Sequence, residues 1–227
     1  MSAPRIACII PALNAAPTLQ GVVTGLRVAL PGARVTVIDD GSRDDTRRIA
    51  RVCSDVTIPF DRNRGKGAAL RAGFAAATAD DAELVITIDA DGQHDTTFAP
   101  SLVRALASAD VAIGARDRRS PAMPMGRRLT NSLSAAAIAR CIGQRVPDAQ
   151  SGYRAVRAAV LRRIAPRGDR YEFETEFLIL AARCGYRIDY VPVPTWYPAT
   201  VRSQFRTIRD SARIVGTLWR YGMGAHH

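Results

Sequence analysis

Two aspartates separated by one residue form the sharpest chemical signal in the chain. Asp89 and Asp91 stand in Asp89-Ala90-Asp91-Gly92, directly after the apolar run 84–88. Two carboxylates on one turn can approach a single hard cation, and Mg²⁺ and Mn²⁺ prefer such oxygen ligands, which they usually share with substrate phosphates. The pair therefore predicts a divalent-cation site beside a phosphate-bearing ligand. The structural alternative is an Asp-Gly turn whose carboxylates cap backbone amides.

Polar residues also follow three other apolar runs. Pro11 and Asn14 come after the first run, Asp39 and Asp40 after the second, and Arg116 after the fifth. Such positions could bind a ligand. Asn14 could equally cap a helix, the two aspartates could form a turn before a glycine, and Arg116 could be a solvated loop residue.

Lys66 lies in a glycine-rich segment, Asn63-Arg64-Gly65-Lys66-Gly67, which precedes a predicted helix. Glycines free backbone amides, so this segment could hold a phosphate at the start of that helix. The segment lacks the spacing of a Walker A loop. An ordinary glycine-rich loop is the alternative.

The residues above must be positioned by the elements around them, and the first 116 residues alternate apolar runs with helical periods. Strands are expected at 5–10, 34–38, 56–59, 84–88 and 111–114, and helices at 18–30, 44–54, 65–79 and 97–107. Because the strands are continuous apolar runs, they predict an α/β fold with a doubly wound, mostly parallel sheet covered by helices on both faces. Ligands bind beyond the carboxyl ends of such strands, so the polar residues are expected on one rim.

The pattern changes after residue 116. A charged, proline-rich loop is expected at 117–125, a long helix at 126–142, an edge strand at 191–194 and a final helix at 202–221. One apolar stripe runs along the final helix, with most arginines off it; its members are Phe205, Ile208, Ala212, Val215 and Trp219. Such a helix can lie on an anionic membrane or pack its stripe on the domain core, and both interpretations stay open.

Composition excludes several classes of protein. The 227 residues suit one domain, and 47% hydrophobic and 23% charged residues exclude a disordered chain. No apolar window is long enough for a membrane-spanning helix, the first residues do not resemble a signal peptide, and the scattered cysteines suit reduced thiols in the cytoplasm. The net charge of +11 suits a phosphate-rich ligand as well as nucleic acid, but the 6% of aromatic residues do not interleave with the arginines, so we expect no nucleic-acid partner.

Four segments in their order and spacing resemble the family 2 glycosyltransferases, and within them the dolichyl- or polyprenyl-phosphate sugar transferases. The segments are Ile9-Ile10-Pro11-Ala12-Leu13-Asn14, Val37-Ile38-Asp39-Asp40-Gly41-Ser42, Asn63-Arg64-Gly65-Lys66-Gly67 and Asp89-Ala90-Asp91-Gly92-Gln93-His94. Weaker similarity continues through Asp148-Ala149-Gln150-Ser151-Gly152-Tyr153-Arg154 and Phe173-Glu174-Thr175-Glu176-Phe177. The resemblance covers roughly residues 5 to 200.

The resemblance implies a GT-A fold in a single domain of residues 1–227. Residues 1–116 would bind the nucleotide sugar, residues 117–201 would form the acceptor half, and residues 202–227 would form the amphipathic helix. It implies an inverting transfer of a sugar from a UDP- or GDP-linked donor to an acceptor, most readily a polyprenyl phosphate or another lipid-linked acceptor. It also implies a cofactor, Mg²⁺ or Mn²⁺, and a cytoplasmic enzyme that is peripheral on the inner membrane.

The resemblance also assigns candidate roles. Catalytic candidates are Glu174, Glu176 and Asp91, with one glutamate as a base and the other structural. The donor nucleotide would be bound by Pro11, Asn14, Asp39, Asp40, Lys66, Asp89 and Arg116. The metal would be bound by Asp89, Asp91 and Gln93, and an acceptor phosphate by Arg127, Arg128, Arg154 and Arg202. Among the acceptor candidates, each arginine taken singly could instead be a solvated surface residue.

Two other functions remain as alternatives. A sugar-nucleotide pyrophosphorylase shares the architecture but would need a glycine-rich loop after the first strand, where residues 11–17 contain no glycine. A basic, non-enzymatic nucleic-acid-binding domain rests on the net charge alone.

Overall fold

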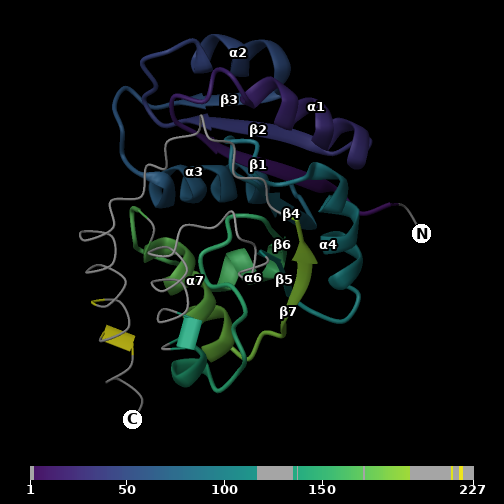
Figure 1. Cartoon of the computed structure of the whole chain (residues 1–227), viewed down its shortest axis with the longest axis vertical. Coiled ribbons are helices and arrows are strands. Elements are labelled where there is room, and N and C mark those ends of the chain that lie inside the picture. The colour runs from purple at the N-terminus through teal and green to yellow at the C-terminus, as the bar shows by residue number, and fades with distance from the viewer. Residues whose placement is uncertain are drawn as a thin grey trace.

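A computed structural model describes residues 3–116, 135–136, 138–170, 172–194, 216 and 220–221. Its centre is a seven-stranded sheet in the order β3-β2-β1-β4-β6-β5-β7 (Figure 1). The strands are β1 (Ile6–Ala12), β2 (Arg34–Asp39), β3 (Val56–Pro59), β4 (Leu84–Thr87), β5 (Val111–Arg116), β6 (Arg154–Arg157) and β7 (Ile188–Val193). The helices are α1 (Leu19–Ala29), α2 (Thr46–Cys53), α3 (Lys66–Ala79), the 3₁₀ turn η1 (Thr96–Phe98), α4 (Ala99–Ala105), α6 (Ala158–Arg163) and α7 (Glu172–Arg183).

The sheet is mostly parallel, as the apolar runs predict. β1 pairs in parallel with β2 and β4, β2 with β3, and β5 with β7. β6 is antiparallel to both of its neighbours, β4 and β5. Because β6 and β7 come from the later part of the chain, that part completes the sheet that the first 116 residues begin.

Helices cover both faces of the sheet, so both sides of each central strand are buried. Ile9 and Ile38 belong to one apolar cluster, together with side chains of α3, α6 and α7. Cys8 and Ile10, the neighbours of Ile9 along β1, belong to a second cluster with side chains of α1, α2 and α4. Figure 1 shows α1 and α2 across the sheet from α3. This two-sided burial explains why the strands are continuous apolar runs.

Two expectations differ in detail from the structure. The helix expected at 97–107 is split into η1 and the short α4, whose first turn contains a proline. The strand expected at 191–194 begins earlier, at Ile188, and lies at the sheet edge as predicted.

The later part of the chain is described in part. Residues 135–136 and 138–142 are helical, in agreement with the helix expected at 126–142. The expected loop at 117–125, most of the final helix, and the acceptor candidates Arg127, Arg128 and Arg202 lie outside the described residues. No helix in the described part of the chain is both long enough and apolar enough to cross a bilayer.

Candidate active site

The carboxyl ends of β1, β2 and β4 meet at one rim of the sheet. Ala12 at the end of β1 lies opposite Asp39 at the end of β2, and β4 lies on the other side of β1. Asn14, Asp39 and Asp89, which are far apart in the sequence, therefore come from neighbouring strand ends. This is the rim on which the sequence predicts a ligand site.

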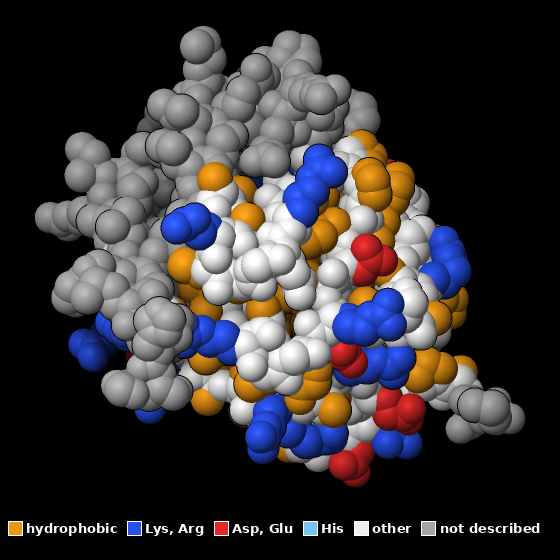
Figure 2. All heavy atoms as spheres, turned by 90° about the horizontal axis from the view of Figure 1, so that it is seen from below, with side chains coloured by type: hydrophobic (Ala, Val, Ile, Leu, Met, Phe, Trp, Pro, Cys, Tyr) orange, Lys and Arg blue, Asp and Glu red, His pale blue; other side chains and the backbone are white. Residues whose placement is uncertain are grey.

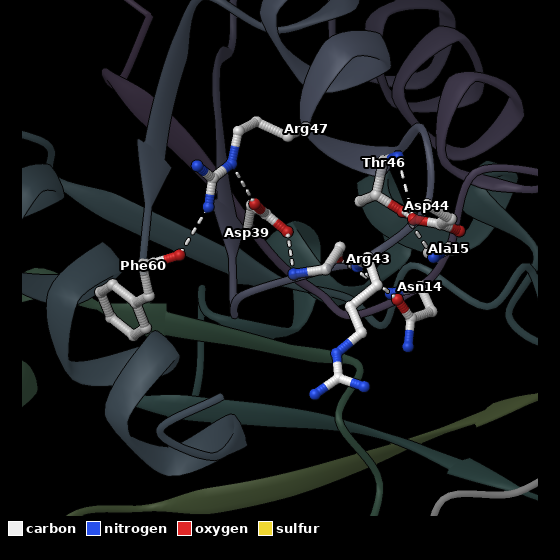
Figure 3. A network of polar contacts seen from close by, with 9 residues as sticks. Asn14, Ala15, Asp39, Arg43, Asp44, Thr46, Arg47 and Phe60 are labelled. Carbon is white, nitrogen blue, oxygen red and sulfur yellow. Dashed lines mark hydrogen bonds and ion pairs between the residues drawn. The ribbon is translucent and has the colours of Figure 1, made fainter. Parts of the chain in front are cut away.

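Hydrogen bonds lock the loops after β1 and β2 together (Figure 3). The backbone N–H of Asn14 donates to Ser42 Oγ at 2.9 Å, and Asn14 Oδ1 accepts from the backbone N–H of Arg43 at 2.9 Å. Ala15 N–H donates to Thr46 Oγ1 at 2.7 Å. Asn14 adopts a left-handed backbone with φ of 50°, which asparagine tolerates better than most residues. Asn14 therefore stays exposed on the rim while its backbone is fixed.

Asp39 and Asp40 lie beneath the rim. Asp39 is fully buried; its Oδ1 accepts from Ser42 N–H at 3.0 Å and its Oδ2 from Arg47 Nε at 2.7 Å (Figure 3). Asp40 accepts from the backbone N–H groups of Arg64 at 2.6 Å and Gly65 at 3.0 Å. Burial raises the pKa of Asp40, although these amides oppose the rise. The carboxylates hold these loops in place, and their contact with the donor nucleotide stays a prediction.

Lys66 stands between two carboxylates. Its Nζ lies 2.6 Å from Asp89 Oδ1 and 2.8 Å from Glu174 Oε1, and the three residues come from α3, the end of β4 and α7. Burial alone would raise the pKa of Asp89, but the Lys66 ammonium outweighs it and lowers that pKa. Burial would likewise lower the pKa of Lys66, and the two carboxylates raise it instead. The lysine and Asp89 are therefore both charged at neutral pH.

Gly152 closes this site from the side of β6. A Cβ at this position would lie 2.6 Å and 2.7 Å from the two carboxylate oxygens of Asp89 and 2.7 Å from Lys66 Nζ. Only glycine leaves room for the ion pair and for any ligand atom beside the Asp89 carboxylate. Gly152 stands in one of the segments that resemble the family, but the sequence alone does not show why a glycine is needed there.

The residues predicted to hold a divalent cation offer oxygen donors. Asp91 Oδ1 accepts from Gln93 N–H at 3.0 Å, so the turn after β4 is folded back on itself. No cluster of three or more His, Cys, Asp or Glu side chains arranged for a metal occurs among the residues described. Asp89 and Asp91 carry the carboxylate oxygens that Mg²⁺ or Mn²⁺ prefers, and at a two-carboxylate site Gln93 and ligand phosphates would supply the further oxygens.

Arg116 forms a buried pair that the sequence did not predict. Its Nε and Nη2 donate to Asp148 Oδ2 and Oδ1 at 2.6 Å and 2.9 Å. Asp148 is 1% exposed; burial would raise the pKa of its carboxyl, but Arg116 lowers it. Arg116 is therefore not a solvated loop residue. Asp148 also occupies two of its guanidinium nitrogens, so these do not point at a ligand.

Arg154, one of the candidates for binding an acceptor phosphate, lies in the core. It is 4% exposed, and its guanidinium donates to the backbone carbonyls of Ser151 at 2.8 Å, Ala149 at 3.1 Å and Glu174 at 3.3 Å. Burial lowers the pKa of Arg154. The Arg154 guanidinium links the segment before β6 to α7. From the sequence, only a solvated surface position or a contact with the acceptor phosphate was expected for this residue.

The two candidate catalytic glutamates are both buried and both engaged. Glu174 faces Lys66, as described above. Glu176 Oε2 accepts from the backbone N–H groups of Arg167 and Gly168 at 2.8 Å and 2.7 Å, and its Oε1 accepts from the Tyr221 hydroxyl at 2.6 Å. Glu176 therefore links the backbone of residues 167–168 to Tyr221, and its role as base or structural residue stays a prediction.

Comparison with known proteins bears on what this rim does. A sequence model described as glycosyl transferase family 2 matches residues 7–165. The undecaprenyl-phosphate mannosyltransferase of Micrococcus luteus is 32% identical over 97% of this chain and 95% of its own length. The chain belongs to glycosyl transferase family 2. The resemblance drawn from the four rim segments is thereby confirmed.

One further relative and one solved structure extend the comparison. The polyprenol monophosphomannose synthase of Mycolicibacterium smegmatis is 31% identical over 83% of this chain and 76% of its own. The glucosyl-3-phosphoglycerate synthase of Mycobacterium tuberculosis, solved with Mn²⁺ and UDP-glucose, matches with a TM-score of 0.78 over 97% of this chain and 80% of that one, at 24% identity. This likeness confirms the expected GT-A fold.

A family 2 glycosyltransferase breaks the bond between a sugar and a nucleoside diphosphate, so charge builds on the leaving diphosphate. Fixed cations and oxygen-bound metals are the usual means of stabilising such charge. The rim supplies a fixed ammonium in Lys66 and carboxylates suited to a cation in Asp89 and Asp91. It is therefore chemically suited to the departure of a nucleoside diphosphate.

Proposed function

We propose that this glycosyltransferase transfers one sugar from a UDP- or GDP-linked donor to the phosphate of a polyprenyl phosphate, with inversion at the anomeric carbon. An acceptor phosphate oxygen attacks the anomeric carbon as the bond to the diphosphate oxygen breaks. The nucleoside diphosphate leaves with the electron pair of that bond. A Mg²⁺ or Mn²⁺ ion held by Asp89, Asp91 and Gln93 would supply positive charge to the diphosphate.

The engagement of both candidate bases is the observation that carries this choice of acceptor. Glu174 is paired with Lys66, and Glu176 is occupied by two backbone amides and the Tyr221 hydroxyl. A hydroxyl acceptor needs a general base to remove its proton. A phosphate monoester is already ionised at neutral pH and needs none, so the buried glutamates favour a phosphate acceptor.

The relatives support the same acceptor class. The Micrococcus luteus relative is named for undecaprenyl phosphate, and the Mycolicibacterium smegmatis relative for a polyprenol monophosphomannose product. The domain would then divide as expected, with residues 1–116 for the donor and 117–201 for the acceptor. Arg127, Arg128 and Arg202 remain the candidates for the acceptor phosphate.

We further propose that the protein binds peripherally to the cytoplasmic face of an anionic membrane that carries the acceptor. The chain has a net charge of +11, and Figure 2 shows several basic side chains spread over one face, with fewer acidic ones. Basic side chains near an anionic surface contribute on the order of 1 kcal/mol each, an attraction that salt screens. Binding to vesicles containing anionic lipid should therefore fall as salt rises, and salt-independent binding would contradict this attachment.

A transfer assay tests the proposed function. The protein is incubated with Mg²⁺ or Mn²⁺, each common UDP- or GDP-sugar and undecaprenyl phosphate, and lipid products are analysed by mass spectrometry. One donor should yield the lipid phosphate plus one sugar, and 3-phosphoglycerate or the uncharged polyprenol should yield no product. Transfer to the polyprenol, or to 3-phosphoglycerate but not to the lipid phosphate, would contradict the proposal.

A further inference from the structure

Lys66 is the only lysine in the chain, since the other 31 of its 32 basic residues are arginine. The single exception stands at the rim, 17% exposed, between Asp89 and the almost fully buried Glu174. A sequence that uses arginine everywhere else keeps a compact ammonium here. The position therefore requires something that a guanidinium cannot provide.

The space around Nζ explains the choice of lysine. Gly152 packs so closely that a single added carbon would lie 2.7 Å from Nζ. A guanidinium is a planar fork with five donors, whereas an ammonium is a compact charge with three donors. Within the described part of the chain, two of these donors face Asp89 and Glu174, which leaves the third for another oxygen.

The backbone around Lys66 is held on both sides. Before it, Gly65 has a φ of 99° and its N–H donates to Asp40. After it, Gly67 N–H donates to the carbonyl of Asp169 at 2.8 Å. Lys66 therefore starts from a fixed point, and the end of its side chain lies between the carboxylates of Asp89 and Glu174.

We propose that Glu174 is a positioning residue that holds the Lys66 ammonium against Oδ1 of Asp89, so that Asp89 turns its other oxygen, and Lys66 its third donor, toward the donor diphosphate and its cation. This inference rests on the proposed function for the identity of the ligand. Glu174 acts through Lys66 and touches no reacting atom. Its carboxylate also offsets the extra positive charge that Lys66 would otherwise bring beside a cation.

This role makes a different prediction from that of a general base. Replacing a base lowers the transfer rate and leaves nucleotide binding unchanged. Replacing a residue that positions Lys66 changes the surroundings of the lysine ammonium and weakens metal-assisted nucleotide binding. Changes to residues that orient a metal ligand typically cost about 10- to 100-fold in metal affinity.

The single lysine permits a direct test by NMR. Protein labelled with ¹³C- and ¹⁵N-lysine gives one lysine side-chain signal, which is followed at pH 7 on addition of Mg²⁺ with UDP or GDP. In the wild type this signal should shift when the nucleotide binds. In Glu174→Gln the lysine signal of the nucleotide-free protein should differ from that of the wild type, and the Mg²⁺-dependent nucleotide affinity should drop by about tenfold or more.

Two further variants make the outcome decisive. Glu172→Gln changes another acid in the first turn of α7, and should leave the Lys66 signal and the nucleotide affinity as in the wild type. Glu174→Asp keeps the charge and should restore part of both; it also replaces Glu174→Gln if that variant does not fold. A variant at Glu174 that loses transfer but keeps the wild-type lysine signal and nucleotide affinity would overturn the inference. These readouts need no acceptor, so failure of transfer to polyprenyl phosphate alone would count only against the proposed function.

Discussion

His94 is a buried titratable residue next to the proposed cation site. It is 7% exposed, and its ring centroid lies 5.3 Å from that of Tyr153. Its Nδ1 has no hydrogen-bond partner among the described residues. Burial lowers the pKa of His94 from 6.5 to about 4, although Asp89 opposes the shift. The imidazole is therefore neutral in the folded protein at pH 7.

Protonation of His94 should make the fold sensitive to acid. Because the unfolded chain binds the proton more readily, the stabilisation is complete above pH 6.5 and is lost as the pH falls toward 4. The loss should be on the order of 3 kcal/mol at most, at about 1.4 kcal/mol per pKa unit. Urea unfolding in metal-free buffer at several pH values measures it, and His94→Gln should flatten the curve in this window.

His226→Gln serves as the control for that measurement, since it removes a histidine close to the end of the chain. It should keep the wild-type pH dependence. If His94→Gln and the wild type lose the same stability between pH 6.5 and pH 4, His94 is not the source of the acid sensitivity.

At the scale of elements, α3 approaches the sheet through Gly73. A Cβ there would overlap Cγ2 of Ile9 and lie 2.9 Å from Cδ1 of Ile38. Ile9 and Ile38 are fully buried in adjacent strands, so neither side chain can move away freely. The close approach matters because α3 begins at Lys66 and so sets the position of the ammonium on the rim.

Gly73→Ala should therefore destabilise the protein by roughly 1–3 kcal/mol, the usual range for overpacking a core. Gly21→Ala is the matched control, because Gly21 is also inside a helix, α1, but a Cβ there would meet nothing within 4 Å. That change should stabilise by roughly 0.5–1 kcal/mol through helix propensity. Equal effects of the two substitutions in urea unfolding would contradict the packing described for α3.

Most helices and strands could be predicted from the sequence, whereas β6 could not. The first five strands follow from continuous apolar runs. The helix at 18–30 follows from a helical period, the one at 44–54 from a capping aspartate, and the one at 65–79 from its high alanine content. β6 has no such pattern: it is four residues long with an arginine at each end. It is a strand because β4 and β5 pair with it on both sides, and no local signal reports that pairing.

The candidate site follows the same rule. Asp89, Asp91 and Lys66 could be identified because each stands at a strand end or in a glycine-rich loop before a helix. The partners of these residues could not be predicted, because Lys66 meets Glu174, and Arg116 meets Asp148, through folding of distant segments. The burial of Arg154 could not be predicted for the same reason, because it depends on three backbone carbonyls that folding brings to its guanidinium.

At the scale of the whole molecule, Tyr221 near the C-terminus is connected to the rim. Its hydroxyl donates to Glu176, and Glu176 holds the backbone of Arg167 and Gly168. The next residue, Asp169, accepts from the N–H of Gly67 beside Lys66. Tyr221 also packs on the apolar cluster of α3 and α7. Tyr221 therefore contacts the domain. Such a contact is expected if the final helix packs on the domain core, which is one of its two interpretations.

Tyr221→Phe should lower the free energy of unfolding by about 1–2 kcal/mol, since it removes a hydrogen bond to a buried carboxylate. Tyr190→Phe is the control, because the Tyr190 hydroxyl is buried without a hydrogen-bond partner in the described part of the chain. Its removal should be neutral or stabilising. Urea unfolding compares the two variants. A Tyr221→Phe variant as stable as Tyr190→Phe would show that the contact with Glu176 does not anchor the C-terminal segment.

Equilibrium binding of UDP and GDP with and without Mn²⁺ tests most directly whether the rim is a cation-assisted donor site. Isothermal titration calorimetry on the wild type should show that one nucleotide binds at least about tenfold more tightly when Mn²⁺ is present, the low end of the effect that residues supporting metal ligands have on metal affinity. Asp91→Ala should remain folded, because the turn is partly exposed, and should bind that nucleotide equally with and without Mn²⁺. An Asp91→Ala protein that keeps the full effect of Mn²⁺, or a wild type that shows none, would contradict the account.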